Sequence, residues 1–307
     1  MTLHALARAA LQLALLVLLP PLLPGLVARV KARVAGRQGP PVWQLYADLA
    51  RLCRKGEVKS LTAGAPFHLG PVVGAAGALA AGLLVPGPGS PALLSFQGDL
   101  FLLTGLLAAG RFATVLAALD TGSAFEGMGA AREVTFASLA EPALFVCLLV
   151  LSRATGELSL SGMLGPALPG AWAQWAPALL LCAVALFVVA LAENSRIPVD
   201  DPTTHLELTM IHEVMVLDHS GPDLALVLYG AAVKLYVFGA LLARLTLGGA
   251  GQGILSGALG LLLGLGLFAG TVGLVESSMA RLRLVRVPQL LVGAGVLSLF
   301  AFVLLVR

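Results

Sequence analysis

The chain of 307 residues is 58% hydrophobic and only 11% charged, with a mean hydropathy of +0.95. Soluble domains carry about 25% charged residues, so this composition excludes a soluble protein and predicts an integral membrane protein. The net charge of +3 does not indicate a nucleic-acid-binding protein. The basic residues concentrate in two loops beside predicted spans, where anionic phospholipid explains them.

Runs of about 20 apolar residues predict eight transmembrane helices in one membrane domain that covers 1–307. The predicted spans are 5–28, 66–86, 93–119, 132–152, 175–193, 222–245, 252–276 and 287–306. The run from about Ala9 to Ala28 is long enough to cross the bilayer and is followed by basic residues. This pattern predicts a retained first helix rather than a cleaved signal peptide.

The stretch at 41–56, "PVWQLYADLARLCRKG", is too polar to span. Its apolar residues recur at helical spacing while its charged residues fall on other faces, which predicts a short amphipathic helix on the membrane surface.

Basic residues cluster between the first two predicted spans and in the last loop between spans. The loops that contain Arg132 and Arg196 fall on the same side of the bilayer. The positive-inside rule places this side in the cytoplasm and both termini on the outer side of the cytoplasmic membrane.

Several ionisable residues fall within predicted spans, where each costs at least about 2.5–3.5 kcal/mol. Asp99 and Arg111 are about 18 Å apart along one helix and therefore cannot pair with each other. Glu141 lies about 12 Å beyond Glu133, and Lys234 lies in the middle of the sixth span. Arg111 and Lys234 either only neutralise buried carboxylates, or belong with them to a hydrated proton path.

The segment "ENSRIPVDDPTTHLELTMIHE" places five carboxylates, two histidines and one arginine between two apolar runs. It lies in an acidic cytoplasmic loop, 194–221. Its prolines prevent a continuous helix, and Asp201-Pro202 predicts the start of a short helix that ends near Leu217. In such a helix His205, His212 and His219 recur every seven residues, about 10.5 Å apart, which is too far for two of them to ligate one metal ion.

Less specific explanations remain open for individual residues of this loop. Glu207 has the spacing of a capping box with Thr204. Asp200 and Asp201 suit caps and turns, and Glu213 suits a solvated loop. Capping does not explain why the whole cluster lies where spans meet the loop.

Four stretches resemble formate hydrogenlyase subunit 4, the membrane subunit of energy-converting nickel–iron hydrogenases. They are "GRQGPP", "LDTGSAFEGMGAAREVTFASLAEPAL", "ENSRIPVDDPTTHLELTMIHEVMVLDHSG" and "AAVKLYVF". A more distant relative is the quinone-site subunit of respiratory complex I, also called subunit 1. The resemblance covers about 29 to 240 and implies a complex I subunit 1-like fold.

The resemblance assigns roles residue by residue. Glu193, Arg196, Pro198, Asp200, Glu207 and Leu208 fall on the complex I pattern E-x-x-R-x-P-x-D with a later E-L, and Glu133 falls on a glutamate of the third cytoplasmic loop. Asp218 stands, after a short insertion, where complex I has a glutamate. Thr203 and His205 replace two acidic residues, which argues against an ordinary quinone chamber.

We therefore predict a coupling path without catalytic or metal-binding residues. Its carboxylates and lysine are Glu133, Glu141, Glu193, Asp200, Glu207, Glu213, Asp218 and Lys234. The residues expected to order the loops or dock partners are Arg37, Arg132, Arg196, His205 and His212.

The resemblance implies a subunit that anchors a hydrogenase to the membrane and couples electron transfer to proton or sodium transport. The expected partners are hydrogenase large and small subunits, an iron–sulfur subunit and antiporter-like membrane subunits. The nickel–iron centre and iron–sulfur clusters are expected in those partners, because the three cysteines of this chain form no CxxC pair. The resemblance to the complex I subunit also leaves a bound quinone open.

Three alternatives remain. The first is the quinone-chamber subunit of a respiratory complex I. The second is a stand-alone transporter, which predicts internal repeats and broken helices near mid-membrane. The third is a structural anchor with idle carboxylates.

Overall fold

The computed structural model describes residues 3–59, 63–200, 210–248 and 253–306, and these residues form helices and loops without a strand. The α-helices are α1 (Leu3–Leu18), α2 (Leu22–Val34), α3 (Gln44–Leu52), α4 (Ala65–Leu83), α5 (Asp99–Asp120), α6 (Ala124–Thr155), α7 (Leu160–Met163), α8 (Leu168–Glu193), α9 (Gly221–Leu247), α10 (Ile254–Ser278) and α11 (Val287–Val306). Two 3-10 helices are η1 (Glu213–Val216) and η2 (Leu284–Arg286). The predicted all-α membrane fold is confirmed.

Seven helices in the described part are long and apolar enough to cross a bilayer: α4, α5, α6, α8, α9, α10 and the pair η2–α11. The chain is a multi-pass membrane protein. The predicted first span, 5–28, is instead two helices, because α1 and α2 meet at a bend of 53°. The fourth span is also longer than predicted, since α6 has 32 residues and is about 48 Å long, which exceeds the hydrocarbon core of about 30 Å.

The bend between α1 and α2 has a local cause. Pro21 has no backbone N–H, so the carbonyl of Val17 lacks its usual helical donor. The hydroxyl of Tyr229 on α9 donates to this carbonyl at 3.1 Å, and the hydroxyl of Tyr46 on α3 donates to the carbonyl of Leu18. Two tyrosines from other helices therefore satisfy the carbonyl groups that the break exposes.

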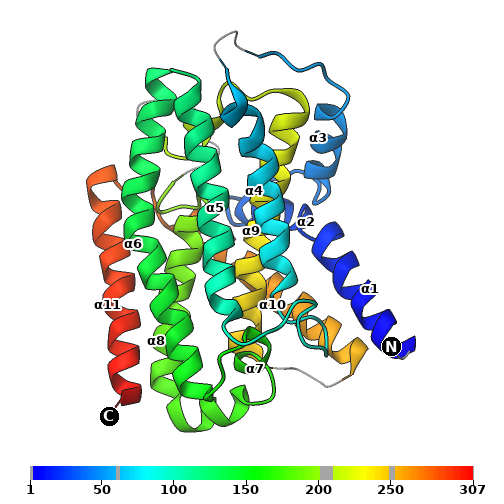
Figure 1. Ribbon diagram of the computed structural model, residues 1–307, viewed down its shortest axis with the longest axis vertical. Helices are drawn as coiled ribbons and strands as arrows, with labels where there is room; N and C mark the ends of the chain where they lie inside the picture. The colour runs from blue at the N-terminus through cyan, green and yellow to red at the C-terminus, as the bar shows by residue number, and fades with distance from the viewer. Residues whose placement is uncertain (1–2, 60–62, 201–209, 249–252, 307) are drawn as a thin grey trace.

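The long helices run roughly side by side in one bundle (Figure 1). Helix α4 packs between α5 and α9, α6 and α8 pack together with α11, and α10 packs against α9 and α2. One end of the bundle, the upper end in Figure 1, holds the segment that joins α8 to α9; we call it the loop end. Both ends of the chain lie toward the opposite end.

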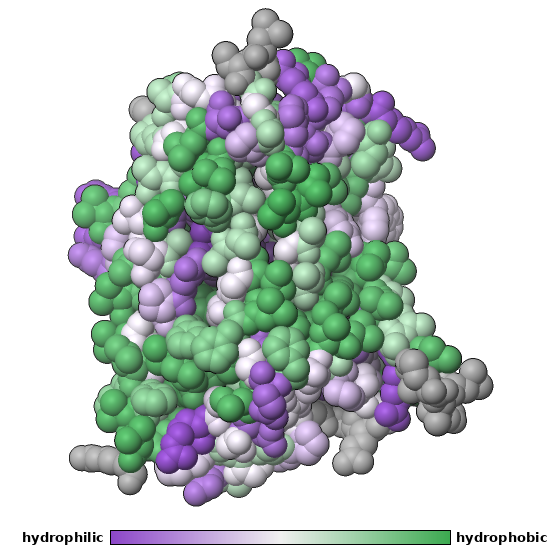
Figure 2. Space-filling model, viewed as in Figure 1, coloured by the Kyte–Doolittle hydropathy of each residue, from purple (hydrophilic) through white to green (hydrophobic). Residues whose placement is uncertain are grey.

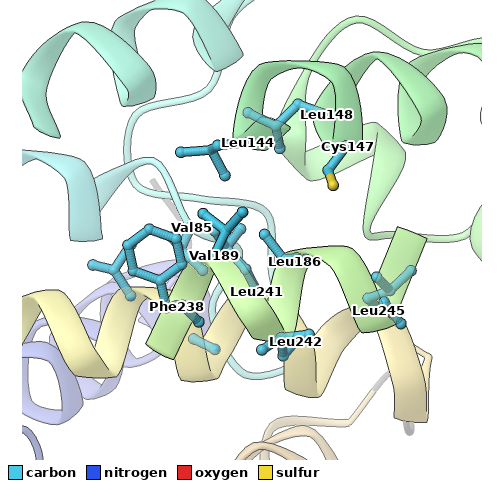
Figure 3. Packing of buried hydrophobic residues seen from close by; sticks show 14 of the residues in the cluster. Val85, Leu144, Cys147, Leu148, Leu186, Val189, Phe238, Leu241, Leu242 and Leu245 are labelled. Atoms are coloured by element: carbon cyan, nitrogen blue, oxygen red, sulfur yellow. The ribbon is translucent and has the colours of Figure 1, made fainter. Parts of the chain in front are cut away.

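A dry core fills the half of the bundle away from the loop end. Leu144 and Leu148 of α6, Leu186 of α8, and Phe238 and Leu241 of α9 are almost completely buried and point toward one another (Figure 3). They recur at the three- and four-residue spacing that places side chains on one helical face. Helix α8 has no charged residue before Glu193, so the interior of this half contains mainly hydrocarbon side chains.

The predicted helix from Pro202 to Leu217 begins in 201–209, outside the described residues. Its described part is not α-helical, because only the 3-10 turn η1 forms there, and this prediction is wrong for 210–217. The Oδ2 atom of Asp200 accepts the backbone N–H groups of Ile211 at 3.2 Å and His212 at 3.1 Å. A side chain therefore takes donors that a helix would have bonded to carbonyls, and His212 and His219 do not share a helical face.

The polar stretch 41–56 contains α3, which packs against α2 and α9. Its apolar residues Leu45 and Leu49 are half-buried, whereas Asp48 pairs with Arg51 on the outside. Its place on a membrane surface stays a prediction.

Candidate functional site

Arg111 lies at the centre of the charged residues inside the bundle. Its guanidinium projects from α5 toward three carboxylates: Nε lies 3.0 Å from Glu133 Oε1, while the two terminal nitrogens pair with Glu141 and Glu193. The planar fork of an arginine presents five donors, so one side chain can bind several carboxylates at once. Arg111 does not pair with Asp99, as their spacing predicts, and Asp99 Oδ1 instead accepts the backbone N–H of Leu160 at 2.7 Å.

From Glu133 the contacts continue toward the loop end through His212. The ring nitrogen Nε2 of His212 lies 3.0 Å from Glu133 Oε2, and Nδ1 lies 3.5 Å from Asp200 Oδ2. The other oxygen of Asp200 lies 2.8 Å from Arg281 Nη2. A histidine from the loop therefore joins a carboxylate of a membrane helix to one of the loop itself.

In the other direction the contacts end at Lys234 on α9. Its Nζ atom lies 2.8 Å from Glu193 Oε2, and it is 13 residues beyond Gly221, about 20 Å into the helix. The connected residues, which we call the ionic network, are Arg281, Asp200, His212, Glu133, Arg111, Glu141, Glu193 and Lys234. Among the described residues they are four carboxylates and four basic groups, whose charges sum to zero when all of them are charged.

The protonation of the loop residues follows from these contacts. Burial lowers the pKa of His212, but the charges of Glu133 and Asp200 and their hydrogen bonds outweigh it and raise the pKa to about 9. Burial raises the pKa of Asp200, but the hydrogen bond and charge of His212, together with Arg281, bring the pKa below its ordinary value. At neutral pH His212 is a cation between two carboxylates.

Glu141 is the residue of the network that is exposed at the side of the bundle. Its side chain is 44% exposed, whereas those of Arg111 and Glu193 are 8% and 2% exposed. A small hollow of about 30 Å³ lies beside these three residues between α5, α6 and α8. Figure 2 shows hydrophilic surface between α5 and α6 in the middle of the apolar belt. Polar lining of this kind is the condition under which an internal hollow holds water.

Four other predicted residues lie in the described part of the chain: Arg132, Arg196, Glu213 and Asp218. Arg132 donates to the carbonyl of Met210 at 2.8 Å and so fastens the loop to α6. Arg196 lies 3.4 Å from Glu276 of α10. Glu213 begins η1 and is half-buried. The carboxylate of Asp218 is exposed, and its backbone N–H donates to Glu126 Oε1 at 3.1 Å.

Of the three other predicted residues, only Arg37 lies in the described ranges. Arg37 is exposed beyond α2, and its side chain forms no hydrogen bond or ion pair within the described ranges. His205 and Glu207 lie in 201–209, outside the described residues.

Sequence reasoning did not assign Arg111, Arg281, Glu276 or Lys31 to the predicted coupling path. Arg111 could have been found from its position inside a span, where an unpaired charge is costly. Arg281 belongs to a loop of basic residues and carries no local sign of its partner. Glu276 is buried between Arg196 and Lys31, which lies 3.6 Å away, and no local pattern predicts this contact.

The cysteines do not fit a redox cluster. Cys53 is exposed, while Cys147 and Cys182 are buried in the core between α6 and α8. The chain has three cysteines in total, whereas common iron–sulfur clusters require four thiolate ligands. One mixed group, Glu57, His68 and Asp223, brings ligand atoms within 4.8 Å of one another, but Lys59 already lies 2.7 Å from Glu57.

The comparison with known proteins decides the family. The profile of the NADH dehydrogenase family matches residues 7–306. The chain belongs to this family. Within it, formate hydrogenlyase subunit 4 of Escherichia coli (strain K12) is 32% identical over 278 residues, which cover 87% of the chain and 88% of the relative. The resemblance that the sequence motifs indicate is confirmed.

Two other known proteins are also similar to the chain. Hydrogenase-4 component C of Escherichia coli (strain K12) is 35% identical over 219 residues, or 69% of the chain, and the chain spans 65% of that relative's length. An NADH-quinone oxidoreductase subunit of Paraburkholderia xenovorans (strain LB400) is 27% identical over 224 residues, which cover 69% of the chain and 62% of that relative.

Among solved structures, a chain of the membrane-bound sulfane sulfur reductase, described as an archaeal respiratory membrane complex, has the same fold. The TM-score is 0.82, with 20% sequence identity, over 99% of this chain and 100% of that one. At this identity the likeness concerns the fold. Hydrogenase subunits and a subunit of NADH-quinone oxidoreductase are therefore both relatives of the chain.

Proposed function

We propose that this chain is the membrane-anchoring and ion-coupling subunit of a multi-subunit nickel–iron hydrogenase of the formate hydrogenlyase type. The ionic network carries the proposal. It joins a loop residue, Arg281, to a residue about 20 Å inside the bundle, Lys234, through direct contacts between oppositely charged groups. The names of the two Escherichia coli relatives support the assignment to a hydrogenase.

The physical basis of coupling is charge balance. A network of four carboxylates and four basic groups in a poorly hydrated interior resists any uncompensated charge. When electron transfer in a docked partner changes the charge beside Asp200 and His212, proton affinity shifts at Glu133 and then at the residues that share Arg111. Such interacting groups titrate together, so protonation at one end of the network changes the proton affinity of the groups at the other end.

Within the part of the chain that the structure describes, the network has no charged continuation straight across the membrane. Beyond Glu141 and Glu193, α6, α8 and α9 form the dry core of the opposite half. Glu141 is instead exposed on the side of the bundle, beside the hollow near Arg111. We infer that charge passes sideways at Glu141 to a neighbouring antiporter-like membrane subunit.

The remaining assignments belong to the same proposal. The loop end faces the cytoplasm and binds the hydrogenase large and small subunits and an iron–sulfur subunit, with Arg37 as an exposed docking residue. The nickel–iron centre and the iron–sulfur clusters lie in these partners. The chain lies in the inner membrane with both termini on the outer side, as the distribution of basic residues predicts.

Replacement of Glu133 tests the coupling. The variant Glu133→Gln keeps the shape of the side chain but removes one carboxylate from both Arg111 and His212. In inverted membrane vesicles we expect the number of ions moved per hydrogen evolved to fall severalfold, because charge no longer passes between the loop and Arg111. The measurement is hydrogen evolution alongside a fluorescent reporter of the proton or sodium gradient.

The matched control is Glu157→Gln, because Glu157 lies in the loop after α6 at the opposite end of the bundle, outside the network. Glu157→Gln should leave both hydrogen evolution and the number of ions moved per hydrogen evolved unchanged. Fully coupled hydrogen evolution in Glu133→Gln would instead support a structural anchor with idle carboxylates.

A second candidate is the quinone-chamber subunit of a respiratory NADH-quinone oxidoreductase, which the similarity to the Paraburkholderia relative favours. Purification of the complex and mass spectrometry of its subunits distinguish the two. A companion large subunit with paired CxxC nickel ligands supports the hydrogenase, and one without them supports the quinone enzyme.

A further inference from the structure

Glu57, His68 and Asp223 form a second cluster of ionisable side chains, which the proposed function does not use. Each offers one oxygen or nitrogen atom, and these three atoms lie within 4.8 Å of one another. Glu57 follows α3, whereas His68 lies in the first turn of α4 and Asp223 in the first turn of α9. Both of these helices begin at the loop end (Figure 1). The cluster therefore joins three segments that are far apart in the sequence, outside the ionic network.

Hydrogen bonds and close packing hold the segment that carries the first of these residues. The hydroxyl of Ser220 accepts the backbone N–H of Val58 at 2.9 Å and donates to the carbonyl of Val58 at 3.0 Å. Gly221 has a φ of +54°, and a Cβ atom there would lie 3.1 Å from a carbonyl oxygen of the same segment. Glycine adopts this conformation at little cost. The segment is therefore fastened to the start of α9, which places Glu57 beside Asp223.

The closest approach within the cluster is between His68 and Asp223. His68 Nδ1 lies 3.9 Å from Asp223 Oδ2, which is too long for a hydrogen bond. Both atoms are buried, and neither has a hydrogen-bond partner in the described part of the chain. Zinc lies about 2.0–2.1 Å from an imidazole nitrogen and about 2.0–2.2 Å from a carboxylate oxygen. One ion can therefore contact both atoms at their present separation and satisfy both of them.

Glu57 and Lys59 decide how an ion reaches this pair of atoms. The side chains of Glu57 and His68 are 27% and 38% exposed, so the cluster is accessible from solvent. Lys59 Nζ lies 2.7 Å from Glu57 Oε2 and balances one of the two carboxylate charges. A divalent cation balances both. Because a lysine ammonium sits on a flexible four-carbon stem, Lys59 can turn toward solvent when such a cation takes its place.

We propose that Glu57, His68 and Asp223 bind one zinc ion. Three protein ligands leave the fourth position of a tetrahedral zinc site for water or for a ligand from a neighbouring subunit. An imidazole ligand favours zinc and related transition-metal ions over Mg²⁺ and Ca²⁺, which prefer oxygen. The bound ion fastens the segment after α3 to α4 and α9. This site does not depend on the proposed hydrogenase function.

The test uses the full chain purified in a neutral detergent, treated with a chelator and then freed of it by dialysis. Isothermal titration with Zn²⁺ measures the affinity, and elemental analysis after gel filtration counts the zinc bound to each chain. We expect one zinc ion for each chain, which an equal concentration of Mg²⁺ does not displace. Displacement by Mg²⁺ would show that the imidazole is not a ligand and would overturn the proposal.

Three variants assign the binding to this cluster. His68→Gln should weaken zinc binding by at least about tenfold, since even the loss of a group that only orients a ligand costs about 10–100-fold in metal affinity. Lys59→Gln should bind zinc more tightly than the unmodified chain, because the competing ammonium is gone. The matched control is Asp48→Asn on α3, which removes a carboxylate about as exposed as that of Glu57. This control should bind zinc as the unmodified chain does.

The outcome does not depend on the folding of one variant. If His68→Gln does not fold, the affinity of Lys59→Gln decides, because a surface ion pair outside a metal site would leave zinc binding unchanged. An unmodified chain that binds no zinc overturns the proposal. Zinc binding that is equal in the unmodified chain, His68→Gln and Lys59→Gln also overturns it.

Discussion

At the scale of single residues, Arg111 holds together carboxylates that would repel one another without it. Glu133, Glu141 and Glu193 come from two helices and meet at one guanidinium. Removing one partner of a buried ion pair costs about 3–5 kcal/mol, because the other charge is left unpaired. The arginine and its carboxylates are therefore mutually dependent, and a change of protonation at one of them alters the balance at the others.

His212 makes the loop end of the network sensitive to pH. Its pKa is raised to about 9 in the folded protein, from an ordinary 6.5. A raised pKa means that the stabilising contribution is complete below about 6.5 and is lost as the pH rises through about 9. We therefore expect the difference in melting temperature between the unmodified chain and His212→Gln to be largest below pH 6.5 and to shrink toward pH 10.

The measurement is thermal unfolding of both proteins in the same detergent across this pH range. A difference in melting temperature that stays constant from acid to alkaline pH would contradict a charged His212 between Glu133 and Asp200.

At the scale of elements, the segment 210–216 is positioned by contact with α6. Gly129 allows this contact, because a Cβ atom there would lie 2.3 Å from a methyl group of Val214 and 3.0 Å from the carbonyl of Ile211. Arg132, one turn further along α6, binds the carbonyl of Met210. The first turns of α6 therefore fix where His212 meets the network.

Substitution of Gly129 by alanine should move this segment. Overpacking of this kind costs about 1–3 kcal/mol, and we expect Gly129→Ala to lower both the melting temperature and the coupling of ion transport to hydrogen evolution. The matched control is Gly127→Ala in the same helix, where a Cβ atom meets nothing within 4 Å. This control should be neutral or more stable by up to about 1 kcal/mol, because alanine favours the helix. Equal effects of the two variants would contradict the argument.

At the scale of the whole molecule, the bundle has two unlike halves. The ionic network lies toward the loop end, and the dry core fills the other half. This division agrees with a charge-transfer path that enters the bundle from the loop end and leaves at its side, at Glu141. It also means that the orientation of the bundle decides from which compartment the network is reached.

The natural cysteines provide a test of that orientation. Cys53 follows α3 at the loop end and is exposed, whereas Cys147 and Cys182 are buried. If the loop end faces the cytoplasm, a membrane-impermeant maleimide should label the chain in inverted vesicles stripped of peripheral subunits and not in right-side-out vesicles. Cys53→Ser should abolish the labelling. Labelling only in right-side-out vesicles would reverse the predicted topology.

The sequence by itself determined the membrane class, most of the spans and the family, because hydropathy, apolar run length and short motifs are local properties. It also indicated Glu133, Glu193, Asp200 and Lys234 as unusual, since charges beside apolar runs are costly.

Only the tertiary structure decided which charges meet. Arg111 and Glu193 are 82 residues apart in the chain, and their contact depends on how α5 and α8 both pack against α6. The same holds for the bend after α1, which tyrosines of α3 and α9 stabilise, and for the loop before α9, where Asp200 takes the backbone donors that a helix would have used. These contacts depend on packing between segments that are far apart in the sequence. No periodicity within one segment therefore predicts them.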